Sequence, residues 1–197
     1  MIDTIIFDIG DVLVAFDWQT NLRSHGFSNE KFEIIANAVY RHVDWQEMDR
    51  GVLSLEEVIT RFSSRAPQYA EDIRRLILET KNTIRQHSYA KPLIKAIQDA
   101  GMKVYYLSNY GKFGYEETKE QLDFIPMMDG GLFSYEVQMV KPNPWIFAEL
   151  MKRYQIRPES AVFFDDNPAN VEAAKSMGLH AEVFTSYKQV EKYIPTA

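Results

Sequence analysis

Asp8 is the first residue of this chain whose type and position could support chemistry. It follows the short apolar run Thr4–Phe7, and Gly10 stands two residues further on. Glycine lets the backbone turn sharply and bring a carbonyl oxygen close to a bound ion. A carboxylate and a carbonyl oxygen at such a turn are hard ligands of the kind that Mg²⁺ prefers. The alternative is an Asx-type turn that only ends a strand.

A pair of carboxylates, Asp165 and Asp166, follows a second apolar run, Ala161–Phe164. Two adjacent carboxylates after a buried strand are costly unless a cation or hydrogen-bond donors neutralise them. Successive strand residues point to opposite faces, so we expect one of the two to face a metal and the other to orient a loop or a neighbouring side chain. A turn or an N-cap before Pro168 is the alternative, although one aspartate would be enough for a cap.

Groups that could bind an anion follow a third apolar run, Lys103–Leu107. Ser108 and Asn109 offer a hydroxyl, an amide and turn N–H groups, which suit a phosphate oxygen. Lys141 precedes Pro142 just before an expected helix, and it could bring a positive charge to the same edge. Ordinary turn residues and a solvated loop lysine are the alternatives.

The elements around these residues predict a parallel sheet. The three apolar runs, with a weaker fourth at Ala181–Phe184, are nearly continuous, as expected for strands that are covered on both faces. Helical patterns stand between them, at Lys91–Ala100, Trp145–Tyr154 and Asn170–Ser176. This alternation predicts a Rossmann-like, doubly wound α/β fold with the polar clusters gathered at the carboxyl ends of its strands.

One long stretch does not fit this alternation. Between about Asp17 and Ser88 the pattern is helical and contains no convincing strand. Helices are expected at Glu30–Tyr40, Ser54–Ser63 and Glu71–Gln86, with a capping box at Ser54 and Glu57. About seventy residues are too many for a plain crossover. We therefore predict a helical cap domain at residues 17–88, inserted into a catalytic core made of residues 1–16 and 89–197.

The order of these motifs resembles that of the haloacid dehalogenase superfamily of phosphohydrolases. The motifs of this chain are IIFDIGDVLV, YYLSN, VKPNPWIF and VFFDDNPANVEAA, and the superfamily also places a helical cap after the first motif. The resemblance therefore covers nearly the whole chain. FDIGDVLV, FFDDNPAN and the cap stretch 45–51 (WQEMDRG) look most similar to small sugar-phosphate phosphatases of the α-glucose-1-phosphatase type.

The resemblance implies a role for each motif. Asp8 matches the nucleophile that forms an aspartyl-phosphate. Asp8, the carbonyl group of Gly10 and Asp166 match the Mg²⁺ ligands of the family, and Asp165 matches a residue that supports these ligands without binding the ion. The groups that match the binding of phosphoryl oxygens are Ser108 and Lys141, with Asn109 as a further donor.

Two positions depart from the family pattern. Gly10 stands where most family phosphatases carry a second aspartate that acts as general acid/base, and Asp11 comes one residue later. We expect Asp11 or a water molecule to replace that aspartate, although dehalogenases of the family also lack it. Asn170 stands where many members carry an acidic residue near the metal, and we expect any effect of Asn170 to pass through water.

Composition excludes several classes of protein. The 197 residues have a net charge of −6, with 46% hydrophobic and 25% charged residues, which is typical of a globular domain. The chain has no cysteine, which excludes disulfides, zinc–cysteine sites and a cysteine nucleophile. No run of Lys or Arg exceeds two residues, so we expect no nucleic-acid or membrane partner. The acidic N-terminal stretch is a poor signal peptide, and we expect a cytoplasmic location.

Aromatic and histidine residues give weaker predictions. Trp18, Trp45 and Tyr40 lie in the expected cap. We expect Tyr40 to pack in its core, whereas the two tryptophans fit a core or a substrate pocket equally well. The four histidines are scattered without the spacing of metal ligands.

The sequence therefore predicts a Mg²⁺-dependent phosphatase for a small phosphorylated metabolite such as a sugar phosphate. A 2-haloacid dehalogenase is one alternative, although that chemistry has no need of a cation site at Asp165 and Asp166. A catalytically silent binding protein on the same scaffold is another, and the glycine at position 10 is its best support. The substrate and the oligomeric state cannot be predicted from these residues.

Overall fold

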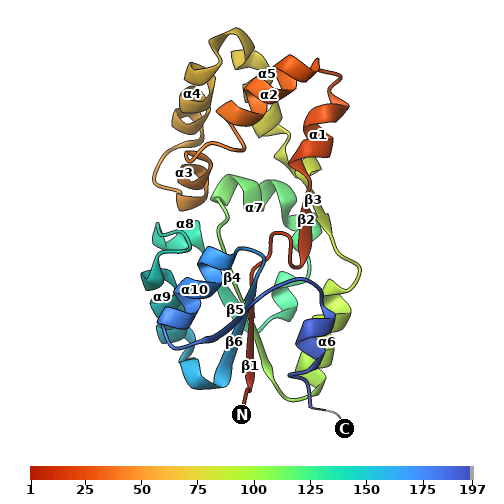
Figure 1. Ribbon diagram of the computed structural model, residues 1–197, viewed down its shortest axis with the longest axis vertical. Helices are drawn as coiled ribbons and strands as arrows, with labels where there is room; N and C mark the ends of the chain where they lie inside the picture. The colour runs from red at the N-terminus through yellow and green to blue at the C-terminus, as the bar shows by residue number, and fades with distance from the viewer. Residues whose placement is uncertain (196–197) are drawn as a thin grey trace.

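A five-stranded sheet forms the centre of the protein, for which the computed structural model describes residues 1–195 (Figure 1). The strands lie in the order β5-β4-β1-β6-β7, and every neighbouring pair is parallel. Their bounds are β1 Thr4–Phe7, β4 Lys103–Ser108, β5 Gly130–Phe133, β6 Ala161–Asp165 and β7 His180–Val183. The register pairs Phe7 with Tyr106 on one side and Phe164 on the other. The carboxyl ends of the three central strands therefore lie together at one edge of the sheet.

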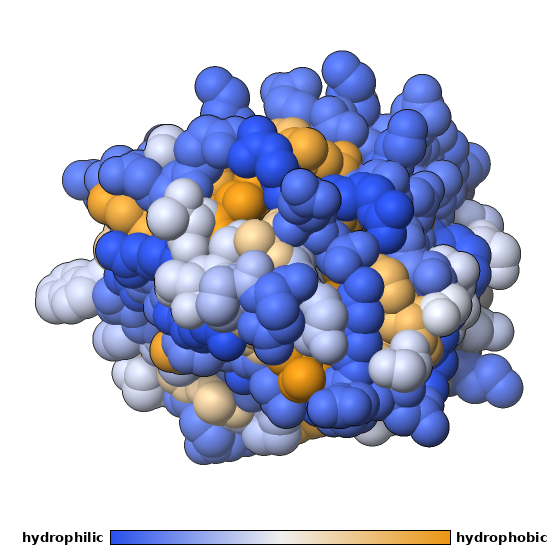
Figure 2. All heavy atoms as spheres, turned by 90° about the horizontal axis from the view of Figure 1, so that it is seen from above, coloured by the Kyte–Doolittle hydropathy of each residue, from blue (hydrophilic) through white to orange (hydrophobic). Residues whose placement is uncertain are grey.

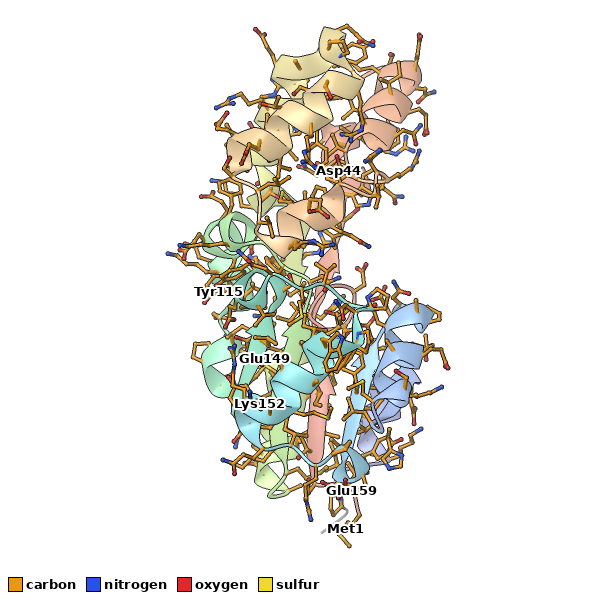
Figure 3. All side chains as sticks on the ribbon, turned by 90° about the vertical axis from the view of Figure 1, so that its left-hand side faces the viewer. Met1, Asp44, Tyr115, Glu149, Lys152 and Glu159 are labelled. Atoms are coloured by element: carbon orange, nitrogen blue, oxygen red, sulfur yellow. The ribbon has the colours of Figure 1, made fainter. Side chains whose placement is uncertain are left out.

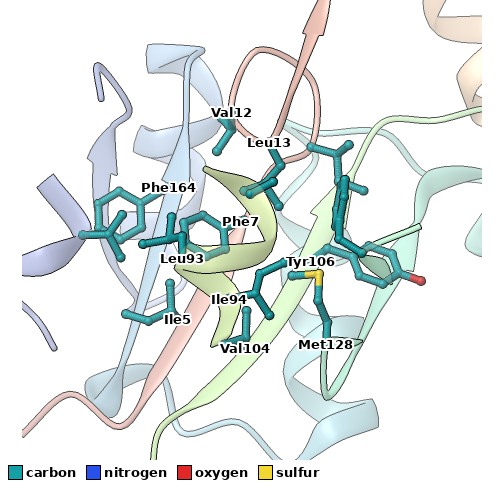
Figure 4. Packing of buried hydrophobic residues seen from close by; sticks show 14 of the residues in the cluster. Ile5, Phe7, Val12, Leu13, Leu93, Ile94, Val104, Tyr106, Met128 and Phe164 are labelled. Atoms are coloured by element: carbon teal, nitrogen blue, oxygen red, sulfur yellow. The ribbon is translucent and has the colours of Figure 1, made fainter. Parts of the chain in front are cut away.

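Helices cover both faces of this sheet, which confirms the predicted doubly wound α/β class. On one face, Leu93 and Ile94 of α6 (Ala90–Asp99) belong to the same buried cluster as Phe7, and Figure 4 shows this packing. On the other face, α9 (Pro144–Tyr154) and α10 (Pro168–Ser176) bury Phe147 and Val171. Strands covered on both sides explain the continuous apolar runs of the sequence.

The edge strand β5 has no counterpart among the predicted strands. It begins with Gly130 and Gly131, and glycine is a poor strand former. A Cβ atom on Gly131 would lie 2.1 Å from the Tyr106 ring, and one on Gly130 would lie 2.4 Å from the Tyr154 ring. Two tyrosine rings therefore occupy the space that strand-forming side chains would need.

An insertion with its own core interrupts the chain after β1. A small antiparallel ladder, β2 (Val14–Phe16) with β3 (Ile84–Gln86), flanks the insertion. Its helices are α1 Trp18–Ser24, α2 Asn29–Ala38, α3 Trp45–Arg50, α4 Leu55–Arg65 and α5 Ala70–Leu78. They share a buried cluster that includes Leu22, Phe62 and Leu76. Figure 1 shows these helices beyond the carboxyl ends of the sheet strands, and we propose residues 17–88 as the cap.

Parts of the insertion differ from the prediction. The capping box is present, since Ser54 Oγ accepts the Glu57 N–H and Glu57 returns a bond to the Ser54 N–H. The predicted absence of strands is wrong, and the helix predicted to reach Gln86 ends at Leu78. A 3-10 turn, η2 (Thr80–Thr83), follows, in which Thr83 Oγ1 donates to the Thr80 carbonyl. Such local side-chain bonds compete with a continuing helix.

Helix α10, which follows β6, also begins earlier than predicted. Its first residue is Pro168 rather than Asn170, and Asn167 caps it by accepting the Ala169 N–H. Proline fits the first position of a helix because its missing N–H has no partner there in any case.

The remaining elements are short and mostly connect the sheet to its helices. They are η1 Pro67–Tyr69, η3 Lys119–Leu122, η4 Ile125–Met127, η5 Pro158–Ser160, α7 Lys112–Thr118, α8 Ser134–Val137 and α11 Lys188–Glu191. α7 lies where the insertion meets the sheet domain, as the position of Tyr115 in Figure 3 shows. Met1 and Glu159 lie at the opposite end of the sheet (Figure 3).

The surface seen from the cap end is mostly hydrophilic, with small separate apolar areas (Figure 2). Within residues 1–195, no helix has the length and the apolar character that are needed to cross a membrane.

Candidate active site

A cavity of about 210 Å³ lies between the carboxyl ends of the strands and the insertion. Its wall includes six of the residues predicted as site residues, which are Asp8, Gly10, Asp11, Ser108, Asn109 and Asp166. The other two, Lys141 and Asp165, are buried and make contacts behind this wall, with 1% and 0% of their surface exposed. The structure therefore brings together all the side chains that the sequence predicted.

The turn after β1 presents the Asp8 carboxylate to the cavity. The Ile9 carbonyl accepts the N–H groups of Leu13 and Val14, which closes a tight loop immediately after the strand. Asp8 Oδ1 accepts the Ile9 N–H at 2.7 Å, and the residue is 8% exposed. Burial raises the pKa of Asp8 to about 7, although the nearby Lys141 ammonium opposes this rise.

The Lys141 ammonium contacts two of the carboxylates. Its Nζ lies 2.9 Å from Asp8 Oδ1 and 2.6 Å from Asp165 Oδ2. Burial lowers the pKa of Lys141, but the attraction of Asp8 and Asp165 outweighs burial and raises the pKa above its usual value. The lysine is therefore charged and fixes the position of the Asp8 side chain.

Both oxygens of Asp165 are occupied by donors of the protein. Oδ1 accepts the Asn167 N–H at 2.8 Å, Oδ2 accepts Lys141 Nζ, and Asn170 Nδ2 lies 3.0 Å from each oxygen. A carboxylate with this many donors orients its neighbours more readily than it binds a metal directly. This geometry agrees with the supporting role expected for Asp165, which stays a prediction.

One oxygen each of Asp8, Asp165 and Asp166 lie within 4.8 Å of one another. The Asp166 residue is exposed, but its carboxyl is partly desolvated at the cavity wall, and this desolvation together with the negative charge of Asp165 raises its pKa. Lys141 pairs with Asp8 and Asp165, so the three carboxylates, when ionised, carry two more negative charges than this one ammonium balances. A divalent cation would balance them.

Asn109 differs from Ser108 in what it contacts. Ser108 is 2% exposed and lines the cavity at the end of β4. The Asn109 side chain pairs with the backbone of Lys141, since its Oδ1 accepts the Lys141 N–H at 2.7 Å and its Nδ2 donates to the Lys141 carbonyl at 3.0 Å. The amide therefore holds the lysine in place, in addition to any contact with a phosphate oxygen.

Asp11 lies in the cavity wall and also shapes the turn. Its φ is 53°, a left-handed conformation that aspartate tolerates better than most residues. Its Oδ1 accepts the Phe16 N–H at 3.0 Å, which joins the turn to β2.

The insertion supplies wall residues that are absent from the predicted site. From α3 come Trp45, Met48 and Asp49, and Phe16 and Ile84 come from the two-stranded ladder. Of the three aromatic residues that the sequence singles out in the insertion, Trp45 lines the cavity, whereas the rings of Trp18 and Tyr40 stack on each other at 4.6 Å. The sequence singles out the stretch 45–51 only for its resemblance, and it does not predict Met48 or Asp49 as residues of the cavity wall.

Comparisons with known proteins agree with this architecture. A model of the haloacid dehalogenase-like hydrolases matches residues 2–178. Drimenol cyclase drtB of Aspergillus calidoustus is 24% identical over 98% of this chain, which spans 36% of the cyclase. Sesquiterpene phosphatase astK of Aspergillus oryzae is 21% identical over 88% of this chain and 85% of its own length.

Two solved structures have the same fold. A HAD family enzyme of Bacteroides thetaiotaomicron, in complex with magnesium and inorganic phosphate, superposes with a TM-score of 0.75 at 18% identity, over 96% of this chain and 99% of the other. L-2-haloacid dehalogenase of Xanthobacter autotrophicus superposes with a TM-score of 0.68 at 17% identity, over 92% and 76%. The fold is therefore common to a magnesium- and phosphate-binding enzyme and to a dehalogenase, and the side chains must separate the two chemistries.

Proposed function

The chain belongs to the haloacid dehalogenase-like hydrolases, and on that basis we propose that it is a Mg²⁺-dependent phosphatase for a small phosphorylated metabolite. The reaction would proceed through an aspartyl-phosphate on Asp8. The observation that carries this proposal is the group of Asp8, Asp165 and Asp166 around one buried lysine at the edge of a cavity.

In this proposal, each group of the site has a defined role. Asp8 attacks phosphorus, and Lys141 keeps the attacking carboxylate in place and attracts the phosphoryl group. Ser108 donates to a phosphoryl oxygen, and Asn109 holds the lysine segment and adds a donor. Asp11 is the candidate acid/base that the sequence supplies, and it lines the same cavity.

The residues present fit a magnesium ion. Asp8, Asp166 and the Gly10 carbonyl would hold it, and the two uncompensated negative charges equal its charge. Among residues 1–195, the buried Asn170 Oδ1 has no hydrogen-bond donor, and such an acceptor fits a water molecule beside an ion. When bound, Mg²⁺ would neutralise phosphoryl charge so that the Asp8 carboxylate can approach an anion.

This same acidic group argues against a dehalogenase. Displacement of a halide from carbon needs a carboxylate nucleophile but gains nothing from two further carboxylates beside it. Asp166 makes that site more negative and would oppose the approach of a haloacid carboxylate.

The residues of the cavity wall indicate which leaving groups the site favours. The charged side chains of the wall, among the described residues, are all acidic, so a leaving group without further negative charge fits best. A sugar is one such group. Phe16, Trp45 and Met48 also make an apolar wall, and the hydroxyl of Thr83 already donates to a backbone carbonyl.

That apolar wall favours a second candidate, a phosphate of an apolar alcohol. One relative of this chain is named a sesquiterpene phosphatase, at 21% identity. A prenyl monophosphate and glucose 1-phosphate would distinguish the two leaving groups in a substrate panel.

Turnover of p-nitrophenyl phosphate tests the proposal. We expect phosphate release that requires Mg²⁺, disappears with a chelator and is abolished in a folded Asp8→Asn variant. Chloride release from a 2-chloro acid that is insensitive to chelator would replace the phosphatase by a dehalogenase. No turnover on a broad panel of phosphate esters, with an intact fold, would instead support a silent binding protein.

A further inference from the structure

Asp49 is an acidic residue of the cavity wall to which the predicted mechanism gives no role. It stands near the end of α3, on the side of the cavity that the insertion forms, whereas Asp8 stands on the side of the sheet. In phosphoryl transfer, the attacking oxygen and the leaving oxygen lie roughly in line on opposite sides of phosphorus. If Asp8 attacks from the sheet, the leaving oxygen therefore points toward the insertion and Asp49.

Backbone contacts hold α3 on the sheet domain at this point. The buried Ser134 Oγ donates to the Asp49 carbonyl at 2.6 Å and accepts the Tyr110 N–H at 2.9 Å. Gly111 packs so closely under α3 that a Cβ atom there would lie 2.5 Å from the Met48 carbonyl oxygen. The position of Asp49 over the cavity is therefore fixed by the fold rather than by a long loop.

We propose that Asp49 is the catalytic residue that protonates the leaving oxygen and later activates the water molecule. This inference rests on the proposed phosphatase function. As an Asp8 oxygen bonds to phosphorus, the bond from phosphorus to the leaving oxygen breaks, and the Asp49 proton moves to that oxygen to give a neutral alcohol. The Asp49 carboxylate then takes a proton from water, whose oxygen attacks phosphorus and releases Asp8 and inorganic phosphate.

The surroundings of Asp49 suit both steps. Asp49 is half-buried, and desolvation of its carboxyl in the cavity, together with the negative charge of Asp8, raises its pKa to about 7, although the Gly111 N–H opposes this rise. Both the acid and the base are therefore populated near neutral pH, which is what a residue that donates and accepts in turn requires. Asp11, by contrast, uses one oxygen to bind the Phe16 N–H and is exposed.

The test compares two leaving groups in the first turnover. p-Nitrophenolate is stable without a proton, whereas the alcohol of an alkyl phosphate needs one. In Asp49→Asn we expect the first turnover of an alkyl phosphate to fall by about 10²–10⁴-fold, while the burst of p-nitrophenolate changes by less than about 10-fold. Steady-state turnover of both esters should fall because the aspartyl-phosphate then hydrolyses slowly.

Three controls make the outcome specific. Glu47→Gln makes the same change on α3, at a side chain that pairs with Arg50, and should leave both rates unchanged. Asp49→Glu should recover part of the alkyl phosphate rate. In the unsubstituted protein, kcat/KM for the alkyl phosphate should fall above about pH 7 and that for p-nitrophenyl phosphate should not.

The failure of this inference can be told from that of the proposed function. An inactive unsubstituted protein would remove the phosphatase function itself. An active protein in which Asp49→Asn leaves both esters unchanged, or slows both first turnovers equally, would overturn the role of Asp49 alone. If Asp11→Asn instead produced the selective loss, the acid would be Asp11, as the sequence predicted.

Discussion

Replacing Lys141 by methionine tests whether the buried ammonium limits the rise in the pKa of Asp8 that burial causes in the folded protein. The lysine is 1% exposed and lies within 2.9 Å of two carboxylates, so its removal leaves buried charges without a partner. Breaking a buried ion pair in this way costs about 3–5 kcal/mol of unfolding free energy. Methionine keeps most of the side-chain volume beside the Phe163 ring, so the loss is mainly electrostatic.

The loss of unfolding free energy in Lys141→Met should increase with pH. Burial already raises the pKa of Asp8 to about 7, and the loss of the ammonium raises it further. A carboxyl whose folded-state pKa is raised stabilises the fold fully at low pH, and this stabilisation is lost as the pH rises through the folded-state pKa. The loss begins at the same unfolded-state pKa in both proteins but continues to a higher pH in the variant, so the deficit in unfolding free energy relative to the unsubstituted protein should grow above about pH 7.

Urea unfolding without divalent cations, at about pH 6 and about pH 8.5, measures this difference. Lys95→Met is the matched control, because Lys95 is 68% exposed and pairs with Asp99 on the surface of α6. We expect the control to change the unfolding free energy by less than about 1 kcal/mol at either pH. A deficit in Lys141→Met that is equal at the two pH values, or no larger than that of the control, would refute the electrostatic reasoning.

Two further variants test how the site is held in place. Asn109→Ala removes both hydrogen-bond partners of the Lys141 backbone. We therefore expect the unfolding free energy in urea to fall by about 1–3 kcal/mol and kcat for p-nitrophenyl phosphate to decrease. An unchanged kcat would show that the lysine does not need this support. Gly111→Ala places a methyl group 2.5 Å from the Met48 carbonyl oxygen, so it should move α3 away from the sheet domain and lower kcat/KM for p-nitrophenyl phosphate. Full activity in this variant would show that α3 need not stay in contact with the sheet domain.

The sequence allowed prediction of those parts of the fold that depend on continuous patterns. β1, β4 and β6 are apolar runs buried on both faces, and each ends in the polar residues that form the site. β5 could not be predicted in this way, because Gly130 and Gly131 are required by the Tyr106 and Tyr154 rings, which only the folded chain brings there. β3 was missed for a similar reason, since three residues gain their strand conformation from pairing with β2.

The residues of the site also fall into those that the sequence can predict and those that only tertiary packing places. Asp8, Ser108, Lys141 and Asp166 are all predictable, because the ends of parallel strands and their loops must meet at one edge. Asp49 is some forty residues from Asp8 in sequence, on a six-residue helix without a buried residue of its own. Nothing in its local pattern distinguishes it from a solvated acid. Its place in the cavity depends on how the insertion packs against Ser134 and Gly111, which is a property of the tertiary structure.

The balance of charge connects these two halves of the cavity. On the sheet side, Lys141 offsets part of the charge of three carboxylates, and a divalent cation would offset the rest. On the side of the insertion, desolvation of the Asp49 carboxyl and the negative charge of Asp8 favour its neutral form, and Lys141 opposes this only weakly. Carboxyl groups in one small cavity can therefore take different roles, because a cation favours the ionised form and burial without a cation favours the protonated form. Asp8 would react as a nucleophile toward phosphorus while Asp49 keeps the proton that the leaving oxygen needs.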